Sequence, residues 1–235
     1  MNPVLNDKTF SNLTSSSEVM TTNGVINKSI FLWAILAAGA YIGWTKASVV
    51  VPLLIPAMLV AFVLAMVSTF KKSLSPLLSP MYAFLEGFVI GAITVFFEKD
   101  YPGIAVNAVF LTVSVLVCML AAFKARIIKP TNKFYAVVGI STMAIALLYL
   151  VDIVITLCGG AGFPFITSTG TFGIIFSIIV VLIASLNLII DFDFIQKGVA
   201  FGAPKYMEWY GAFALMVTIV WLYLEILRLL AKSRR

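Results

Sequence analysis

The chain has 235 residues, of which 62% are hydrophobic and only 11% are charged. A soluble domain carries about 25% charged residues, so the composition excludes an ordinary soluble enzyme and indicates a protein of the lipid bilayer. The formal net charge is +6, but the basic residues stand in short clusters between apolar runs. That spacing is typical of membrane topology signals, and we therefore expect no nucleic-acid partner.

The sequence also restricts catalytic chemistry. It has no histidine and two cysteines, Cys118 and Cys158, which lie in or beside apolar runs. The missing histidine removes histidine metal sites and both the Ser-His-Asp and the Cys-His forms of catalysis. The Gly-x-Gly-Asp motif of an intramembrane aspartyl protease does not occur. We expect neither an enzyme nor a bound cofactor.

Seven apolar runs have the length of a membrane span, which is roughly 17–25 residues. In chain order they are residues 26–44, 49–70, 81–97, 104–123, 134–157, 172–195 and 209–231. Pro52 and Pro56 predict an irregular start for the second run. The Ser-Pro-rich residues 73–80 predict a turn, and residues 159–170 predict a loop. The fold class that we predict is an all-α, polytopic membrane protein with seven transmembrane helices.

The polar N-terminal residues 1–28 lack the early apolar region of a secretion signal. We predict a flexible cytoplasmic tail over residues 1–28 and one transmembrane domain over residues 29–235. Ten Lys and Arg residues lie in this tail and in the loops after the second, fourth and sixth runs, against six on the other side. The positive-inside rule then places the N-terminus in the cytoplasm. Seven spans place the C-terminus outside, although its basic residues also permit a re-entrant last segment.

Four acids lie inside the runs, where ionisable groups are costly and usually face a cavity or a partner. They are Glu86, Asp152, Asp191 and Glu225. The helix rise sets Glu86 and Asp191 roughly 6–8 Å from the predicted cytoplasmic end, and Asp152 and Glu225 roughly 24–27 Å from it. Carboxylates that share a poorly hydrated site rarely ionise together, so a pair can sense pH. When deprotonated, a pair offers hard oxygen ligands to Ca²⁺. A packing role through hydrogen bonds remains the alternative.

Further residues could support these acids. Asn187 lies one turn before Asp191, and Arg228 follows Glu225 at the i,i+3 spacing of helix ion pairs. The remaining candidates are Asp193 at a span end and Lys71 on the inner side.

The last two runs carry motifs that resemble a known family. Asp191-Phe-Asp-Phe-Ile-Gln-Lys197 and Leu222-Tyr-Leu-Glu-Ile-Leu-Arg-Leu-Leu230 resemble the closing motifs of the Bax inhibitor-one-like family. Glu86-Gly-Phe-Val-Ile-Gly91 is similar to its third-span motif. The segments Asn2-Pro3, Met20-Thr-Thr-Asn-Gly-Val-Ile-Asn-Lys28 and Gly202-Ala-Pro-Lys-Tyr-Met-Glu-Trp-Tyr210 resemble a bacterial subgroup of that family.

The resemblance implies a seven-helix bundle with the last helix central, in a bacterial inner (plasma) membrane. It also implies a pH-sensitive Ca²⁺ leak gated by an acidic pair, here Asp191 and Glu225, which would be the tentative Ca²⁺ ligands. The family usually has Asp in place of Glu225, and Lys71 stands nearest to its gating arginine. Residues 198–206 look inserted, and the helix rise sets the two acids roughly 15–18 Å apart. By helix rise Glu86 is then the better-placed partner for Asp191, whereas the whole-chain resemblance favours a direct pair with Glu225, so both pairings remain open.

We therefore expect a pH-sensitive cation (Ca²⁺) leak channel gated by protonation of intramembrane acids. The alternatives are a proton-coupled transporter or exchanger, and a non-transporting regulator that binds a protease or another membrane complex. The expected partners are the lipid bilayer and cations, with a membrane protein added under the last alternative. The sequence leaves ion selectivity and oligomeric state open.

Overall fold

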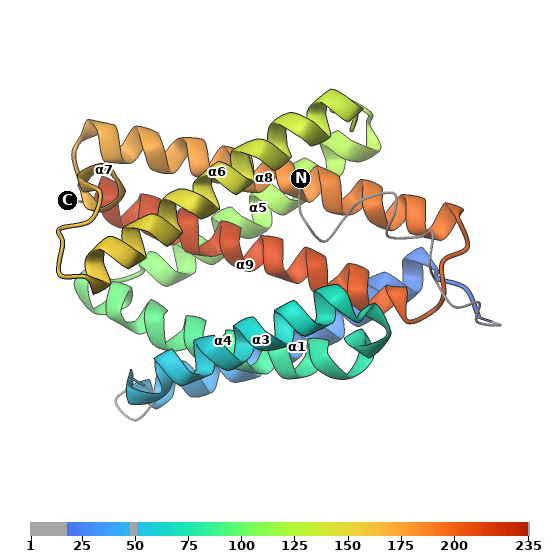
Figure 1. The fold of residues 1–235 in the computed structure, drawn as a ribbon, viewed down its shortest axis with the longest axis horizontal. Coiled ribbons are helices and arrows are strands. Elements are labelled where there is room, and N and C mark those ends of the chain that lie inside the picture. Colours follow the sequence, from blue (N-terminus) through green and yellow to red (C-terminus); the bar gives the residue numbers. More distant parts are fainter. Residues whose placement is uncertain (1–17, 48–50, 235) are drawn as a thin grey trace. The chain divides into compact units, whose positions relative to one another are not determined.

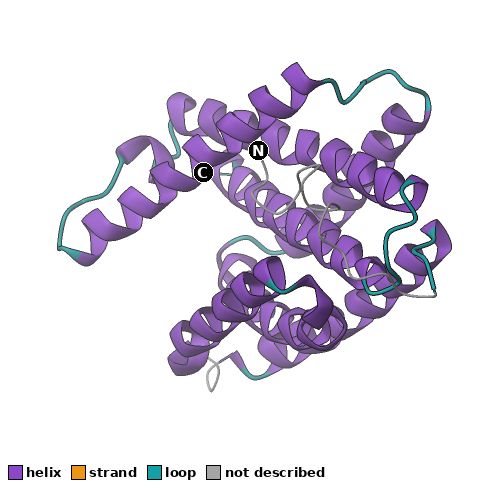
Figure 2. Cartoon of the chain, turned by 45° about the vertical axis from the view of Figure 1, so that its right-hand side comes forward, coloured by secondary structure: helices purple, strands orange, loops and turns teal. Residues whose placement is uncertain are grey.

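The computed structural model describes residues 18–47 and 51–234. Seven helices in this part of the chain are long and apolar enough to cross a membrane, and Figure 1 shows them in chain order. They are α1 (Thr22–Thr45), η2 with α3 (Val51–Leu53, Leu54–Phe70), α4 (Ser75–Asp100), α5 (Ile104–Lys124), α6 (Asn132–Leu157), α8 (Thr171–Ala200) and α9 (Met207–Ser233). Figure 2 shows helices and loops, without a strand in the described ranges. The predicted all-α polytopic class is confirmed.

The second and third spans meet at a tight connection. The irregular start of the second span is confirmed, because Val51–Leu53 form the short 3-10 helix η2. The predicted turn over residues 73–80 is wrong, since η3 (Lys72–Leu74) leads directly into α4, which continues through Pro80. A proline in the first helical turn removes no bonded N–H, and Pro76 holds that place. The buried hydroxyls of Ser68 and Ser75 lie 3.2 Å apart and join α3 to α4.

The connection between α8 and α9 is shorter than expected. Helix α8 continues to Ala200, so that residues 201–206, and not the whole stretch 198–206, form the turn. The N–H of Ala203 donates to Gly198 O and that of Gly202 to Val199 O, at 3.0 and 3.1 Å. This bond pattern is a Schellman motif, which needs a left-handed residue. Gly202 supplies it with a φ of 64°.

The N-terminal segment packs onto this turn. Met20 N–H donates to Ala203 O at 2.6 Å, and Lys205 N–H donates to Glu18 O at 3.0 Å. Helix α1 then begins at Thr22, and the side chain of Thr21 accepts a hydrogen bond from Gly24 N–H at 2.9 Å, as threonine N-caps do. The predicted flexible tail over residues 1–28 is therefore corrected for residues 18–28. Its first 17 residues lie outside the described ranges.

The chain divides into two compact units. Unit 1 comprises residues 103–192 and 218–234, and unit 2 comprises residues 18–102 and 193–217, as far as they are described. Helix α8 leaves unit 1 after Phe192, and α9 re-enters it at Thr218. The last two helices therefore each contribute residues to both units, so neither unit is a single continuous stretch of the chain.

Four glycines bring α1 and α4 into close contact within unit 2 (Figure 1). They are Gly39, Gly43, Gly87 and Gly91. A Cβ atom on Gly39 would lie 2.3 Å from Phe84 O, and one on Gly87 would lie 2.1 Å from Leu36 O. No side chain fits at those distances, so the two backbones touch as in other small-residue helix pairs.

Burial separates the spans into two groups. In α4, α8 and α9, 50, 50 and 56% of the apolar window is buried, against 17% in each of the other four spans. The latter carry strongly exposed apolar side chains, such as Ile55, Phe62 and Phe110. Large exposed apolar surfaces of this kind suit contact with lipid. Helix α9 is the most buried span.

Candidate ion site: the acids within the spans

Asp191 is a fully buried acid on α8, with 1% of its surface exposed. The three residues before it, Leu188, Ile189 and Ile190, are equally buried. Neither carboxylate oxygen of Asp191 has a hydrogen bond of standard geometry within the described chain. The Thr218 side chain on α9 is the polar neighbour that interacts with this carboxyl group. An ionised carboxylate is costly in such surroundings.

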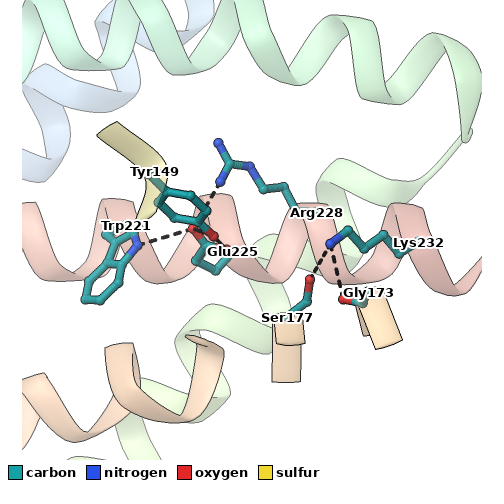
Figure 3. Close-up of polar contacts among 7 residues, drawn as sticks. All are labelled: Tyr149, Gly173, Ser177, Trp221, Glu225, Arg228 and Lys232. Atoms are coloured by element: carbon teal, nitrogen blue, oxygen red, sulfur yellow. Dashed lines mark hydrogen bonds and ion pairs between the residues drawn. The ribbon is translucent and has the colours of Figure 1, made fainter. Parts of the chain in front are cut away.

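Glu225 on α9 is also buried, but its charge is compensated from three directions, as Figure 3 shows. The Tyr149 hydroxyl on α6 lies 3.1 and 3.0 Å from Oε1 and Oε2 and donates to the carboxylate. Trp221 Nε1 and Arg228 Nη1 each donate to Oε1 at 3.2 Å. The predicted Glu225–Arg228 pair is confirmed. This set of donors makes Glu225 an anchored charge.

The donors of Glu225 are themselves held in place. The Arg228 guanidinium lies 5.2 Å from the centre of the Tyr149 ring, a cation–π arrangement. One turn further along α9, Lys232 Nζ donates to Ser177 Oγ at 2.9 Å and to Gly173 O at 3.2 Å, at the start of α8 (Figure 3). Together these contacts tie the C-terminal half of α9 to α6 and α8 within unit 1.

Asp191 and Glu225 do not share a hydrogen bond, because Asp191 has none and all the partners of Glu225 are accounted for by other side chains. Thr218, the neighbour of Asp191, precedes Glu225 by two helical turns, or roughly 10 Å along α9. The structure therefore keeps these carboxyl groups in separate environments. Glu86 belongs to unit 2, where it is partly exposed on α4 and interacts with Tyr82 one turn before it.

The other predicted residues have structural partners. Asn187 donates to Thr142 Oγ1 and to Ile183 O, both at 2.8 Å, so its amide nitrogen joins α8 to α6. Asp193 forms a 3.0 Å ion pair with Lys197 at i,i+4. Asp152 accepts a 2.6 Å hydrogen bond from Phe163 N–H.

Asp152 thereby holds the loop that contains α7 (Pro164–Thr167) against α6. Lys71 is exposed at the end of α3. The next residue, Lys72, makes the aromatic contact in this region, since its ammonium lies 5.7 Å from the Tyr210 ring centre.

Sequence reasoning missed several members of the site. Trp221 lies four residues before Glu225, a helical spacing that could have indicated the contact, whereas nothing in the sequence pointed to Tyr149. Glu208, in the first turn of α9, is 2% exposed. Its Oε1 accepts from both the N–H and the hydroxyl of Thr21 at 3.0 Å.

The described residues contain no group of three or more Cys, Asp or Glu side chains that could hold a metal ion. Asp191 has no ion pair among the described residues, and Glu225 is paired with Arg228. This arrangement does not resemble a tight Ca²⁺ site, which uses 6–8 oxygen ligands.

Seven apolar helices with ionisable side chains inside them define an integral, polytopic membrane protein that contacts the lipid bilayer. A family model described as Bax inhibitor 1 like matches residues 2–235, essentially the whole chain. The chain therefore belongs to the Bax inhibitor 1 like family. A sequence search of curated proteins gives no match.

Proposed function

We propose that this protein is a pH-sensitive cation leak of the membrane, with Ca²⁺ as its cargo, and that the protonation state of Asp191 controls the conducting state. The observation that carries the proposal is an acid buried at 1% exposure on a membrane span, with the Thr218 side chain as its polar neighbour and no ion pair among the described residues. Intramembrane acids without a structural partner mark ion or proton pathways. Membership of the Bax inhibitor 1 like family agrees with this role.

Asp191 suits a gate better than Glu225 does. Arg228, Tyr149 and Trp221 each hydrogen-bond the Glu225 carboxylate, so this side chain is held in place and acts as an anchor. Asp191 has no such compensation, and adding or removing its proton changes the charge of a buried site. The deprotonated form supplies oxygen ligands for Ca²⁺ and the protonated form withdraws them.

A weak site is what a leak needs, because conduction requires an ion to leave as readily as it enters. Ca²⁺ is therefore treated as transported ion and not as a resident cofactor.

The test is Ca²⁺ flux into liposomes that contain the purified protein, between about pH 5 and about pH 8. We expect flux above empty liposomes, with a pH dependence that Asp191→Asn abolishes while the protein stays folded. Glu225→Gln should change flux and stability together, and its effects should nearly add to those of Asp191→Asn, because groups more than about 7–10 Å apart with separate partners couple weakly.

Other outcomes identify the other candidate functions. Ca²⁺ accumulation against its gradient, driven by a proton gradient alone, would replace the leak with a proton-coupled exchanger. Folded protein without flux at any pH, but with a co-purifying membrane complex, would replace it with a regulator. Strong coupling between Asp191→Asn and Glu86→Gln would assign Glu86 as the partner acid.

We also propose a cytoplasmic N-terminus, from the ten-to-six asymmetry of basic residues. The resemblance of segments such as Gly202–Tyr210 to a bacterial subgroup of the family leads us to propose a bacterial inner membrane as the location. Single cysteines introduced near Thr14 and at Ser233, in a variant without Cys118 and Cys158, test the orientation by accessibility labelling. Labelling of both ends from the cytoplasmic side would contradict seven complete spans.

A further inference from the structure

The connection between α5 and α6 concentrates positive charge. Lys124, Arg126, Lys129 and Lys133 are all exposed, and we call them the α5–α6 basic loop. The nearest acids in the sequence are Asp100 and Asp152. Within residues 18–47 and 51–234, none of the four side chains forms a hydrogen bond or an ion pair. The loop therefore has four uncompensated cations at the ends of two spans.

The backbone at Arg126 is the second observation. Ile127 N–H donates to Ala122 O and Arg126 N–H donates to Phe123 O, both at 3.0 Å, so α5 ends in a Schellman motif. The left-handed position of this motif normally holds glycine, as Gly202 does at the end of α8. Here it holds arginine with a φ of 54°, the one non-glycine residue with positive φ in the described part of the chain. A side chain kept in such a conformation points to a function.

The apolar residue of the loop is the third observation. Ile127 has 77% of its surface exposed, directly beside Arg126 and between the last turn of α5 and the first turn of α6. At the end of a span this level of the bilayer holds the lipid headgroups. An apolar side chain there inserts toward the acyl chains, while neighbouring cations remain with the phosphates.

Helix electrostatics does not account for the set. The helix dipole favours cations near the C-terminus of a helix, which explains Lys124 and Arg126. It disfavours cations in the first turn of a helix. Lys133 lies in the first turn of α6, and Lys129 lies just before it. A topology signal needs basic residues in the loop, but it does not require arginine at a position that favours glycine.

We propose that the α5–α6 basic loop binds the headgroup phosphate of an anionic glycerophospholipid, with Arg126 as the central ligand. The guanidinium offers five donors in a planar fork that matches two phosphate oxygens. Lys124, Lys129 and Lys133 add attraction for the anionic headgroup, and Ile127 packs against its acyl chains. The site is independent of the leak, and it adds a specific lipid partner to the general bilayer contact.

The test uses the purified full-length protein in neutral detergent. Lipid occupancy is measured by native mass spectrometry during titration with phosphatidylglycerol or with phosphatidylcholine of the same acyl chains. We expect tighter binding of phosphatidylglycerol, and a loss of about fivefold for each cation removed, which corresponds to the usual attraction of one basic residue to an anionic surface.

Arg126→Gly is the decisive variant, because glycine suits the backbone there. Its thermal stability should hold or rise while its affinity for phosphatidylglycerol falls about fivefold. Arg126→Gln/Lys129→Gln should lose more, and Lys46→Gln, which removes an exposed cation at the end of α1, should lose nothing.

Equal binding of both lipids to the wild type would overturn the proposal. So would an equal loss in Lys46→Gln, unchanged affinity in Arg126→Gly, or a destabilised Arg126→Gly, which would assign Arg126 to the fold. Displacement of phosphatidylglycerol by equimolar inorganic phosphate would show a free-anion site in place of a lipid site.

Discussion

From the hydrogen bonds that hold Glu225 we predict how much stability Tyr149→Phe loses. The substitution removes one hydroxyl and leaves the ring beneath Arg228. That hydroxyl lies 3.1 and 3.0 Å from the two carboxylate oxygens, so its loss leaves Glu225 with Trp221 and Arg228 alone. A hydrogen bond to a charged group is worth about 1.5–3 kcal/mol, whereas side-chain bonds between membrane helices average about 0.6 kcal/mol. Because Glu225 is buried and paired with Arg228, we expect the unfolding free energy to fall by about 1–2 kcal/mol.

The measurement is equilibrium unfolding in mixed micelles, with Tyr41→Phe as the matched control. Tyr41 lies on α1 with 71% of its surface exposed, so loss of its hydroxyl should leave stability unchanged. In a Glu225→Gln background the cost of Tyr149→Phe should shrink, since the acceptor is then neutral. An equal cost in both backgrounds would show that the Tyr149–Glu225 bond is not the cause. No cost in either background would refute the anchoring of Glu225 by Tyr149.

Three further outcomes follow from unit 2. Gly87→Leu should prevent folding, because its Cβ would lie 2.1 Å from a backbone oxygen, whereas Gly170→Ala, which meets nothing within 4 Å, should leave yield by size-exclusion chromatography unchanged. Glu208→Gln should lower the unfolding free energy by about 1 kcal/mol in the same micelles, since a charged acceptor is lost; unchanged stability would contradict its role. Lys205 lowers the pKa of exposed Glu18 from 4.5, so this pair stabilises at neutral pH and its contribution disappears only as acid titrates the carboxylate. Because salt screens an exposed ion pair, Glu18→Gln should shift the melting temperature at low salt and leave it unchanged at high salt.

The sequence was sufficient for the features that hydropathy controls. Seven spans and the irregular start at Val51–Leu53 follow from apolar length and proline chemistry. The i,i+3 pair of Glu225 and Arg228 was predictable because it lies on one helix.

The contacts that join separate helices were not predictable in the same way. Tyr149 reaches Glu225 across 76 positions of the chain, and Thr21 reaches Glu208 across 187. No local pattern records such a distance. The segment 73–80 was misassigned because serine and proline usually signal turns, whereas here Pro76 starts a helix whose first serine is buried against Ser68.

The glycine contact between α1 and α4 has a consequence for biosynthesis. Gly39 meets Phe84, which is made about 45 residues later, and translation at about 5–20 residues per second leaves α1 in the membrane for several seconds before α4 emerges. During that interval its groove of small residues faces lipid or insertion machinery and not its final neighbour. A nascent chain stalled before α4 should therefore expose a surface that pairs with any other small-residue helix, including α1 of a second chain. Until the third span is complete, the pairing of α1 with α4 of the same chain therefore competes with the pairing of α1 with a helix of another nascent chain.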